Sequence, residues 1–275
     1  MSAFELAQVF SNVTNRLIQE FDSNPQLYEP VDMDCITSEG WLIKYCIFLE
    51  KMSETDAYNL ISRTLKWRKL KGFAGKVDTD FPRELYQMGS VFQYNQDKDG
   101  NLVMIVRLDR QLGRLVPGAS SRRLAKQFLA HQLDKLDKSA NGNNRFVVLV
   151  DYTGTGSLAL TELQLVLYLI RLVRQFPACR YLIHYNQGPV ARHMVQSTYR
   201  KSMDKFAEKK QIFDHFHDRY LPQYLGGTCT QSMVDTPAQS PGLVDCCDKL
   251  GINRKLVIKH RDQLAKLTIA SQLIN

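Results

Sequence analysis

The side chains that could hold a metal ion or act as nucleophiles show none of the spacings that such chemistry requires. The sequence contains no glycine-rich phosphate loop ending in Gly-Lys-Ser/Thr, no His-Glu-x-x-His pair, no Gly-x-Ser-x-Gly turn and no Gly-x-Gly-x-x-Gly fingerprint. His215 and His217 lie two residues apart, and on a helix this spacing turns the two rings to different faces. We therefore predict no catalytic residue, no metal site, no cofactor and no enzymatic activity.

Asp151 is the best catalytic candidate among the acids. It ends a predicted buried strand, and in α/β sheets ligands bind beyond the carboxyl ends of the strands. A carboxylate in this place can instead cap the following turn by accepting backbone N–H bonds, and we favour that role. The turn contains Gly154-Thr155-Gly156, which is similar to a phosphate loop but lacks its lysine and its later glycine.

The cysteines and the N-terminus predict a cytoplasmic protein. The six cysteines, at positions 35, 46, 179, 229, 246 and 247, form no Cys-x-x-Cys pair. The first ten residues lack the basic start and apolar core of a secretory signal, so reduced thiols are the expected state. Cys246 and Cys247 are adjacent, and we favour two incidental thiols over a redox or metal role.

The charge of the chain favours anionic partners. The 275 residues carry a net charge of +8, with 44% hydrophobic residues as in an ordinary globular protein. We expect transient contact with an anionic membrane surface. The densest basic cluster lies within residues 63–71, and its default interpretation is a solvated helix face. No nucleic-acid partner is expected, because no glycine–aromatic pattern accompanies the basic residues.

The elements that must position these residues begin with a helical lobe. Apolar residues recur with a helical period over residues 3–20 and 56–71, and residues 41–49 predict a short helix between them. Residues 23–34 contain two prolines and predict a linker. Gly72 and Gly75 end the last helix of this lobe.

Beyond residue 76, strand and helix patterns alternate, which predicts a parallel sheet with crossover helices. Strands at 90–94 and 102–108 flank Asp97-Lys98-Asp99-Gly100-Asn101, a turn that can reverse the chain. Residues 146–152 form a β-branched run typical of a strand buried on both faces. The other expected elements are helices at 120–137, 158–176, 189–204 and 210–220 and strands at 180–185 and 205–207.

The chain therefore divides into a helical lobe at 1–75, an α/β domain at 76–229, and a linker with a C-terminal amphipathic helix at 230–275. The sequence L-P-Q-Y-L-G-G-T at 221–228 closes the α/β domain. Pro222 fixes φ, and Gly226 and Gly227 allow backbone angles and close approaches that side chains forbid. We expect a flexible connector at 230–241 and one helix at 249–273.

Several of these motifs, in this order and spacing, resemble the CRAL-TRIO family of lipid-carrying proteins, and above all the CRAL-TRIO domains of motile-sperm-domain-containing proteins. The resemblance covers about residues 41–228. It rests on Trp67-Arg68, the turn at 97–101, the strand at 146–151 with its final Asp, Phe176-Pro177 followed by Gly188-Pro189, and Lys205-Phe206 followed by L-P-Q-Y-L-G-G.

The resemblance implies an α/β fold with a mixed, mainly parallel sheet, flanking helices, a helical N-terminal lobe, and a deep apolar pocket closed by a mobile gate helix. The implied function is binding, and transfer or sensing, of one phospholipid or other lipid-like ligand. For the apolar pocket we name Tyr168, Leu172, Ile183, Tyr185, Met194, Tyr199 and Phe206.

The headgroup residues of the family are only partly present. Members that bind inositide headgroups carry a glutamate directly after the first of the two proline landmarks, where this chain has Ala178. Two of the matching basic positions are retained, as Lys51 and Lys205. The gate at 189–205 is several residues short and contains Arg192. We name Lys205, Arg192 and Lys51 as candidates for contact with a headgroup or an anionic surface.

Two functions follow from these observations. The first is a lipid-binding protein with a shortened, basic gate. The second is an interaction module for a small GTPase or another signalling protein that has lost lipid exchange. Bulky side chains such as Tyr168, Tyr181, Tyr185 or Tyr199 filling the pocket would favour the second function.

Overall fold

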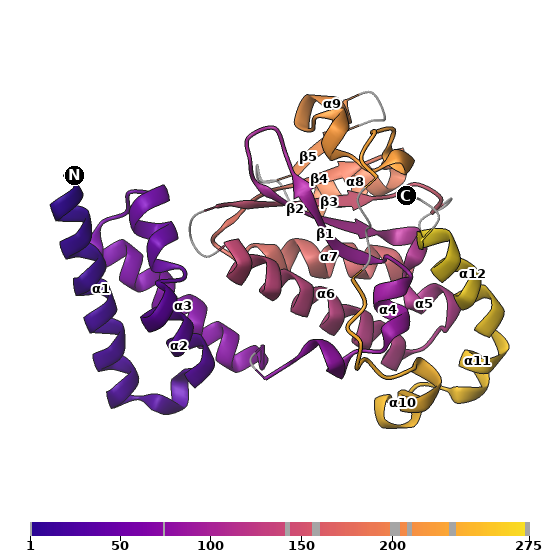
Figure 1. Cartoon of the computed structure of the whole chain (residues 1–275), viewed down its shortest axis with the longest axis horizontal. Helices are drawn as coiled ribbons and strands as arrows, with labels where there is room; N and C mark the ends of the chain where they lie inside the picture. Colours follow the sequence, from indigo (N-terminus) through magenta and orange to yellow (C-terminus); the bar gives the residue numbers. More distant parts are fainter. Residues whose placement is uncertain are drawn as a thin grey trace.

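The computed structural model describes residues 2–73, 75–140, 144–155, 160–198, 204–207, 211–230 and 235–272. A five-stranded, mixed, mainly parallel sheet forms the centre of the molecule, and a lobe of helices precedes it in the chain (Figure 1). The expected α/β class is therefore confirmed. The boundaries expected near residues 75 and 229 stay predictions.

The helical lobe is built from helices whose ends follow ordinary capping rules. Ser2 begins the first helix: its hydroxyl accepts the N–H of Glu5, and the Glu5 carboxylate accepts the N–H of Ser2. Val13 and Leu17 form the buried stripe of this helix. The helices of the lobe are α1 (Ala3–Ser23), the 3₁₀ turn η1 (Pro25–Leu27), α2 (Pro30–Glu39), η2 (Tyr45–Leu49) and α3 (Glu54–Lys71).

Two predictions for the lobe differ from the structure in part. The expected linker at 23–34 contains a 3₁₀ turn and the start of α2, because Pro30 occupies the first helical position, where its missing N–H costs nothing. The expected helix at 41–49 is present over residues 43–49, but most of it is η2, a π-helical segment. Leu42 and Lys51 flank it with φ values of 49° and 53°, which a regular helix does not contain.

The sheet has the order β1-β2-β3-β4-β5. β1 and β2 form the predicted antiparallel hairpin, and β2 to β5 run parallel, as the strand–helix alternation predicted. The Asp97 carboxylate holds the hairpin turn by accepting the N–H groups of Asp99 and Asn101. The strands are β1 (Val91–Gln96), β2 (Leu102–Arg107), β3 (Phe146–Asp151), β4 (Cys179–Tyr185) and β5 (Asp204–Ala207).

Different parts of the chain cover the two faces of the sheet. Met104, Val148 and Leu182 belong to one hydrophobic core with residues of α6 (Ala119–Ala140), α7 (Leu160–Val173) and α8 (Pro189–Thr198). The other face belongs to a second core, which includes Tyr181 and Ile183 and is covered by α9 (Ile212–His215), the turns η5 (Asp218–Tyr220) and η6 (Gln223–Leu225), and the residues around them. The helix expected at 210–220 is thus two short pieces.

In the L-P-Q-Y-L-G-G-T segment, Gly227 packs closely against the backbone of Leu221, as the sequence predicted for this glycine pair. A β-carbon on Gly227 would lie 2.1 Å from the carbonyl oxygen of Leu221, so no other residue fits there without a shift of the backbone. Gly226 has a φ of 91° and ends η6. Leu221 and Leu225 are buried in the second core, which fixes this segment against the sheet.

The C-terminal region packs on the body of the molecule as three helices instead of the expected single one. Gly251, with a φ of 65°, ends the first of them. The N–H of Leu243 donates to Glu84 at 2.8 Å, and Arg110 donates to the carbonyl of Leu267 at 2.9 Å. The three helices are α10 (Leu243–Leu250), α11 (Arg254–Lys259) and α12 (Arg261–Gln272), and this region lies against α4 (Arg83–Gln87). The remaining described elements are η3 (Asp78–Asp80), η4 (Leu108–Arg110) and α5 (Leu112–Leu115).

Candidate functional site

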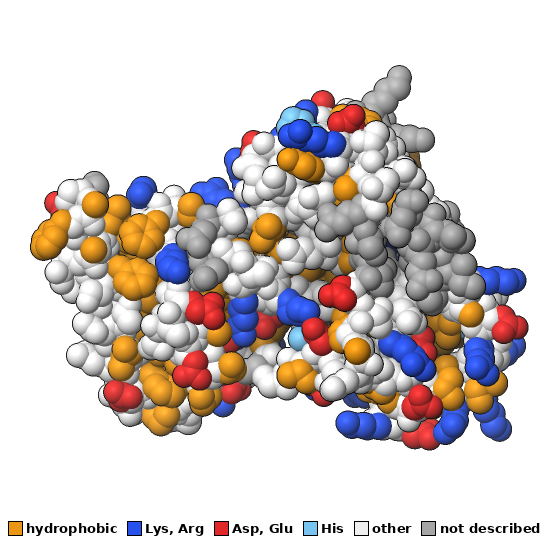
Figure 2. Space-filling view, viewed as in Figure 1, with side chains coloured by type: hydrophobic (Ala, Val, Ile, Leu, Met, Phe, Trp, Pro, Cys, Tyr) orange, Lys and Arg blue, Asp and Glu red, His pale blue; other side chains and the backbone are white. Residues whose placement is uncertain are grey.

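A cavity of about 380 Å³ lies where the end of α3 meets the outer sides of α6 and α7. This volume is within the range of small-molecule binding pockets. In the space-filling view, Lys and Arg side chains, with a histidine among them, lie along the junction of the lobe and the body (Figure 2). The residues that line the cavity are Trp67, Lys71, Gly72, Phe73, Lys76, Gln127, Ala130, His131, Tyr168, Arg171, Leu172 and Gln175.

Aromatic rings form one wall of the cavity. The ring centroids of Trp67 and Phe73 lie 5.0 Å apart, and both rings meet Phe176 edge-on at 6.4 Å and 5.9 Å. Phe73 can approach Trp67 because α3 ends at Gly72, where a φ of 62° turns the chain back. Phe176, from the segment that follows α7, thus supports these two rings, and Trp67 and Phe73 offer an apolar surface to a ligand.

The charge of the cavity lining is positive. Lys71, Lys76 and Arg171 are its lysine and arginine side chains, and none of its described lining residues carries a carboxylate. His131 is oriented by Asp78, with 2.8 Å between its Nε2 and the Asp78 carboxylate. An anionic group is thus the charge that this site would attract.

Tyr168 supplies a hydrogen-bond donor on the α7 side of the cavity. Burial raises the pKa of its phenol, so the hydroxyl stays protonated at neutral pH. Together with Leu172 one turn along the same helix, it presents a ring, an apolar side chain and a donor to the cavity.

A buried charge network holds the lobe against α6 beside the cavity. The Arg68 guanidinium donates to both carboxylate oxygens of Asp32 at 2.7 Å and 3.0 Å, and to Asp134 at 2.5 Å. Lys138 lies 3.3 Å from each of these two carboxylates. Arg68 and Asp32 each keep only about 1% of their side-chain surface exposed, so the centre of this network is almost completely dry. We call Asp32, Arg68, Asp134, Asp137 and Lys138 the lobe–body latch.

The residues expected to form one lipid pocket lie on both faces of the sheet. Tyr168 and Leu172 line the cavity described above. Ile183 and Tyr185 point to the opposite face, where they pack in the second core with the segment around α9 to η6. The expectation that these four residues share one pocket was therefore wrong. Tyr168 and Leu172 belong to the core on one face of the sheet, whereas Ile183 and Tyr185 belong to the core on the other face.

Of the three remaining pocket candidates, two lie on described elements. Met194 is on α8, with 40% of its surface exposed. Phe206 is in β5 opposite His184 in the register, and nothing further is described of its side chain. Tyr199 lies outside the described residues.

The three basic candidates come from separate elements and do not line the cavity. Lys51 is exposed after η2, Arg192 is on α8, and Lys205 is in β5. The Lys205 ammonium lies 3.8 Å from the centre of the Tyr181 ring. The sequence interpretation missed the lining residues Lys71 and Lys76 and the aromatic pair that ends α3; the basic cluster at 63–71 was the signal that could have indicated them.

Asp151 has the structural role that the sequence favoured. Its Oδ1 accepts the N–H of Thr153 at 2.9 Å, as expected for a turn cap. The side chain is fully buried, and burial raises its pKa.

No protein-family model matches this chain. Among the described helices, none has both the length and the apolar character needed to cross a bilayer. The function is therefore argued from the cavity, its charges and the fold.

Proposed function

We propose that this chain is a non-enzymatic binding protein of the CRAL-TRIO type, which takes up one lipid-like amphiphile with an anionic group. The apolar part lies in the cavity between the lobe and α6–α7, and the anionic group lies near Lys71, Lys76 and Arg171. The mixed sheet behind a helical lobe supports the family assignment. Cytoplasmic binding, and transfer or sensing of the ligand, follow from the same assignment.

The observation that carries the proposal is the composition of the cavity. Its described lining combines an aromatic wall and three cations with no carboxylate, around a volume of about 380 Å³. An acyl chain gains about 0.8 kcal/mol for each CH₂ that leaves water, which is the main driving force available to such a site. The cations then select amphiphiles that carry negative charge.

The exposed side of α8 supports contact with membranes during uptake or release. Val190 and Met194 expose 75% and 40% of their surface, and Arg192 and His193 lie between them in the sequence. Apolar and basic residues on one short helix are typical of segments that lie on an anionic headgroup layer. A peripheral, transient membrane association is part of this proposal.

The test begins with lipid extraction of the purified full chain and mass spectrometry of the extract. Lauric acid and lauryl alcohol are then titrated into the delipidated protein by isothermal calorimetry. We expect both to bind and the acid to bind more tightly. Gln127→Trp places a large ring at the cavity rim and should weaken the binding of both ligands about tenfold or more. A tenfold loss of affinity corresponds to about 1.4 kcal/mol of binding free energy.

The matched control for this experiment is Gln19→Trp. Gln19 is exposed on α1 and does not line the cavity, so this variant should bind both ligands as the original chain does. A delipidated chain that binds neither ligand, or equal weakening by the two tryptophan variants, would contradict the proposed function.

A specific observation favours the alternative function, a protein-interaction module. Tyr181 and Tyr185 are buried on the sheet face that the α9–η6 segment covers, and the Tyr181 hydroxyl donates to Asp97 at 2.8 Å. Bulky side chains therefore fill this face, as expected for a relative that has lost lipid exchange. Direct binding of a small GTPase to a chain that takes up neither lauric acid nor lauryl alcohol would support this alternative.

A further inference from the structure

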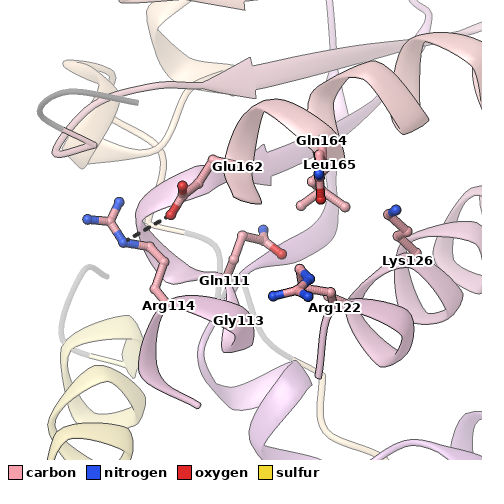
Figure 3. A pocket seen from close by; sticks show the side chains of 9 residues that line it. Gln111, Gly113, Arg114, Arg122, Lys126, Glu162, Gln164 and Leu165 are labelled. Carbon is pink, nitrogen blue, oxygen red and sulfur yellow. Dashed lines mark ion pairs between the residues drawn. The ribbon is translucent and has the colours of Figure 1, made fainter. Parts of the chain in front are cut away.

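A second, much smaller hollow lies between α6 and α7, close to the first residues of both helices. Its volume is about 20 Å³, enough for a group the size of one water molecule, so most of any ligand would remain outside it. Figure 3 shows the side chains of Gln111 and Arg122 turned toward its middle, with Arg114 and Glu162 to one side and Lys126 to the other. The hollow therefore suits one polar group of a larger molecule, or a small ion.

The charges around this hollow do not balance. Arg114 lies 3.4 Å from the carboxylate of Glu162, which keeps only 3% of its side chain exposed. Arg122 and Lys126 have no carboxylate within ion-pair distance among the described residues. One acid thus faces three cations, and two positive charges are left for a ligand.

Arg122 is placed where a helix does not favour a cation. It lies in the fourth position of α6, near the positive end of the helix dipole, and the first turn contains no acidic residue. A β-carbon on Gly113 would lie 3.6 Å from the Arg122 Cγ, which is an ordinary van der Waals distance, so the stem of the arginine lies close to the backbone of α5. Gln111 is fixed beside it, because its amide donates to the carbonyls of Arg107 and Ser90 at 2.7 Å and 3.3 Å.

The hollow adjoins the larger cavity through one pair of residues. The Lys126 ammonium lies 5.4 Å from the centre of the Tyr168 ring. Lys126 lines the hollow and Tyr168 lines the cavity. Along α7, the lining residues Leu165 and Tyr168 are one helical turn apart, which is about 5 Å.

We propose that this hollow is an oxyanion-binding site, in which Arg122 and Lys126 hold a phosphate group. The phosphate comes either from a free ion or from an amphiphile whose chain occupies the neighbouring cavity. The second source rests on the proposed function, and the first does not. Arginine suits this role because its planar guanidinium donates two parallel hydrogen bonds to one phosphate.

The test compares three ligands: inorganic phosphate, lauryl phosphate and lauryl alcohol. Phosphate binding to the ¹⁵N-labelled full chain is followed by amide and Arg side-chain NMR shifts at constant ionic strength. Calorimetry measures the two lauryl compounds. Arg122→Gln removes the charge from the hollow, and Arg123→Gln is the control, since Arg123 is exposed on the same helix and does not line the hollow.

We expect Arg122→Gln to weaken the binding of inorganic phosphate or of lauryl phosphate about tenfold or more, because a hydrogen bond to a charged group is lost. Lauryl alcohol should bind equally to both variants. Loss of inorganic phosphate binding identifies a free-ion site, whereas loss confined to lauryl phosphate identifies a headgroup site.

Three outcomes would overturn the inference. The first is a chain that shows no phosphate shifts and prefers lauryl phosphate equally in both variants. The second is equal weakening of lauryl phosphate and lauryl alcohol by Arg122→Gln, which indicates only a distorted cavity. The third is the same loss of phosphate binding in Arg122→Gln and Arg123→Gln. A chain that binds phosphate but neither lauryl compound contradicts the proposed function alone.

Discussion

Asp137 is a carboxyl group that the fold encloses completely at the junction of the lobe and the body. The indole N–H of Trp41 donates to one of its oxygens at 3.1 Å, and the other oxygen has no hydrogen-bond partner among the described residues. Burial raises the pKa of this carboxyl to about 7; Arg68 opposes the rise and the neighbouring Asp134 adds to it. A single proton on the lobe–body latch therefore titrates near neutral pH.

The free energy of unfolding should fall as the pH rises from about 4 to 7, because the folded chain keeps a proton on Asp137 that the unfolded chain releases. The total effect is on the order of 4 kcal/mol. Asp137→Asn keeps an acceptor for Trp41 and carries no charge. We expect the stability of this variant relative to the original chain to be clearly greater at pH 8 than at pH 5, as measured by urea unfolding.

The comparison needs a control at an exposed carboxylate. Asp34→Asn changes an exposed acid on α2 and should shift stability by little at either pH. A stability difference between the Asp137→Asn variant and the original chain that does not change between pH 5 and pH 8 would contradict this account. The charged groups that face Asp137, which are Arg68, Asp134 and Lys138, are present in both proteins.

At the scale of elements, the latch fixes α2 and α3 to α6. Removing Arg68 leaves Lys138 as the one remaining counter-charge of Asp32 and Asp134 among the described residues, in a largely buried place. Breaking a buried pair from one side typically costs about 3 to 5 kcal/mol. We expect Arg68→Gln to lower stability by about 3 kcal/mol and to speed amide exchange in α1–α3 more than in β2–β4.

Two comparison variants separate the latch from a general loss of structure. Lys69→Gln removes a more exposed ion pair with Glu29 and should cost less than about 1 kcal/mol. Arg68→Met combined with Asp32→Asn and Asp134→Asn removes the buried charges together and should recover part of the lost stability. Equal exchange rates throughout the Arg68→Gln protein would indicate that the lobe is not a separate unit.

The strands could be predicted from sequence because their side-chain patterns are local. The β-branched run of β3 predicted a buried strand, and the Asp-Gly-Asn turn predicted the hairpin, although not the irregular register between Gln93 and Gln96. The π-helical segment η2 could not be predicted, because positive φ values at Leu42 and Lys51 have no signature in those residue types. The C-terminal helix was predicted as one piece, although Gly251 was a visible stop signal.

The candidate site was predicted only in part, because it joins residues distant in the sequence. Tyr168 and Leu172 were named for their place on an apolar helix, and they do line a cavity. Their partners Trp67 and Phe73 come from the lobe, and only the folded chain brings them close. Ile183 was assigned to the same pocket because the alternation along a strand does not reveal which face each helix covers.

At the scale of the whole molecule, the C-terminal helices complete the core. Leu243, Cys247, Val257 and Leu264 are buried in the main hydrophobic core. A chain that ends at residue 229 would expose the apolar partners of these residues. We expect this shortened chain to bind the dye ANS more strongly than the original chain and to unfold at a lower urea concentration.

A four-fold variant tests the same point without shortening the chain. Replacing the four buried residues by alanine should cost about 2 kcal/mol or more for each large side chain, namely Leu243 and Leu264. Replacing exposed Lys249 and Lys255 by alanine should leave stability within about 0.5 kcal/mol. A shortened chain as stable as the original would contradict a structural role for this region.

The hydrogen bond from Arg110 to Leu267 has a consequence for how the protein is made in the cell. It joins the residues just after β2 to a helix that the ribosome synthesises more than a hundred residues later. Until that helix emerges, the nascent chain keeps apolar surface near α4 uncovered, and chaperones bind such surfaces. Folding of this part of the protein is therefore complete only after α10 to α12 have been translated.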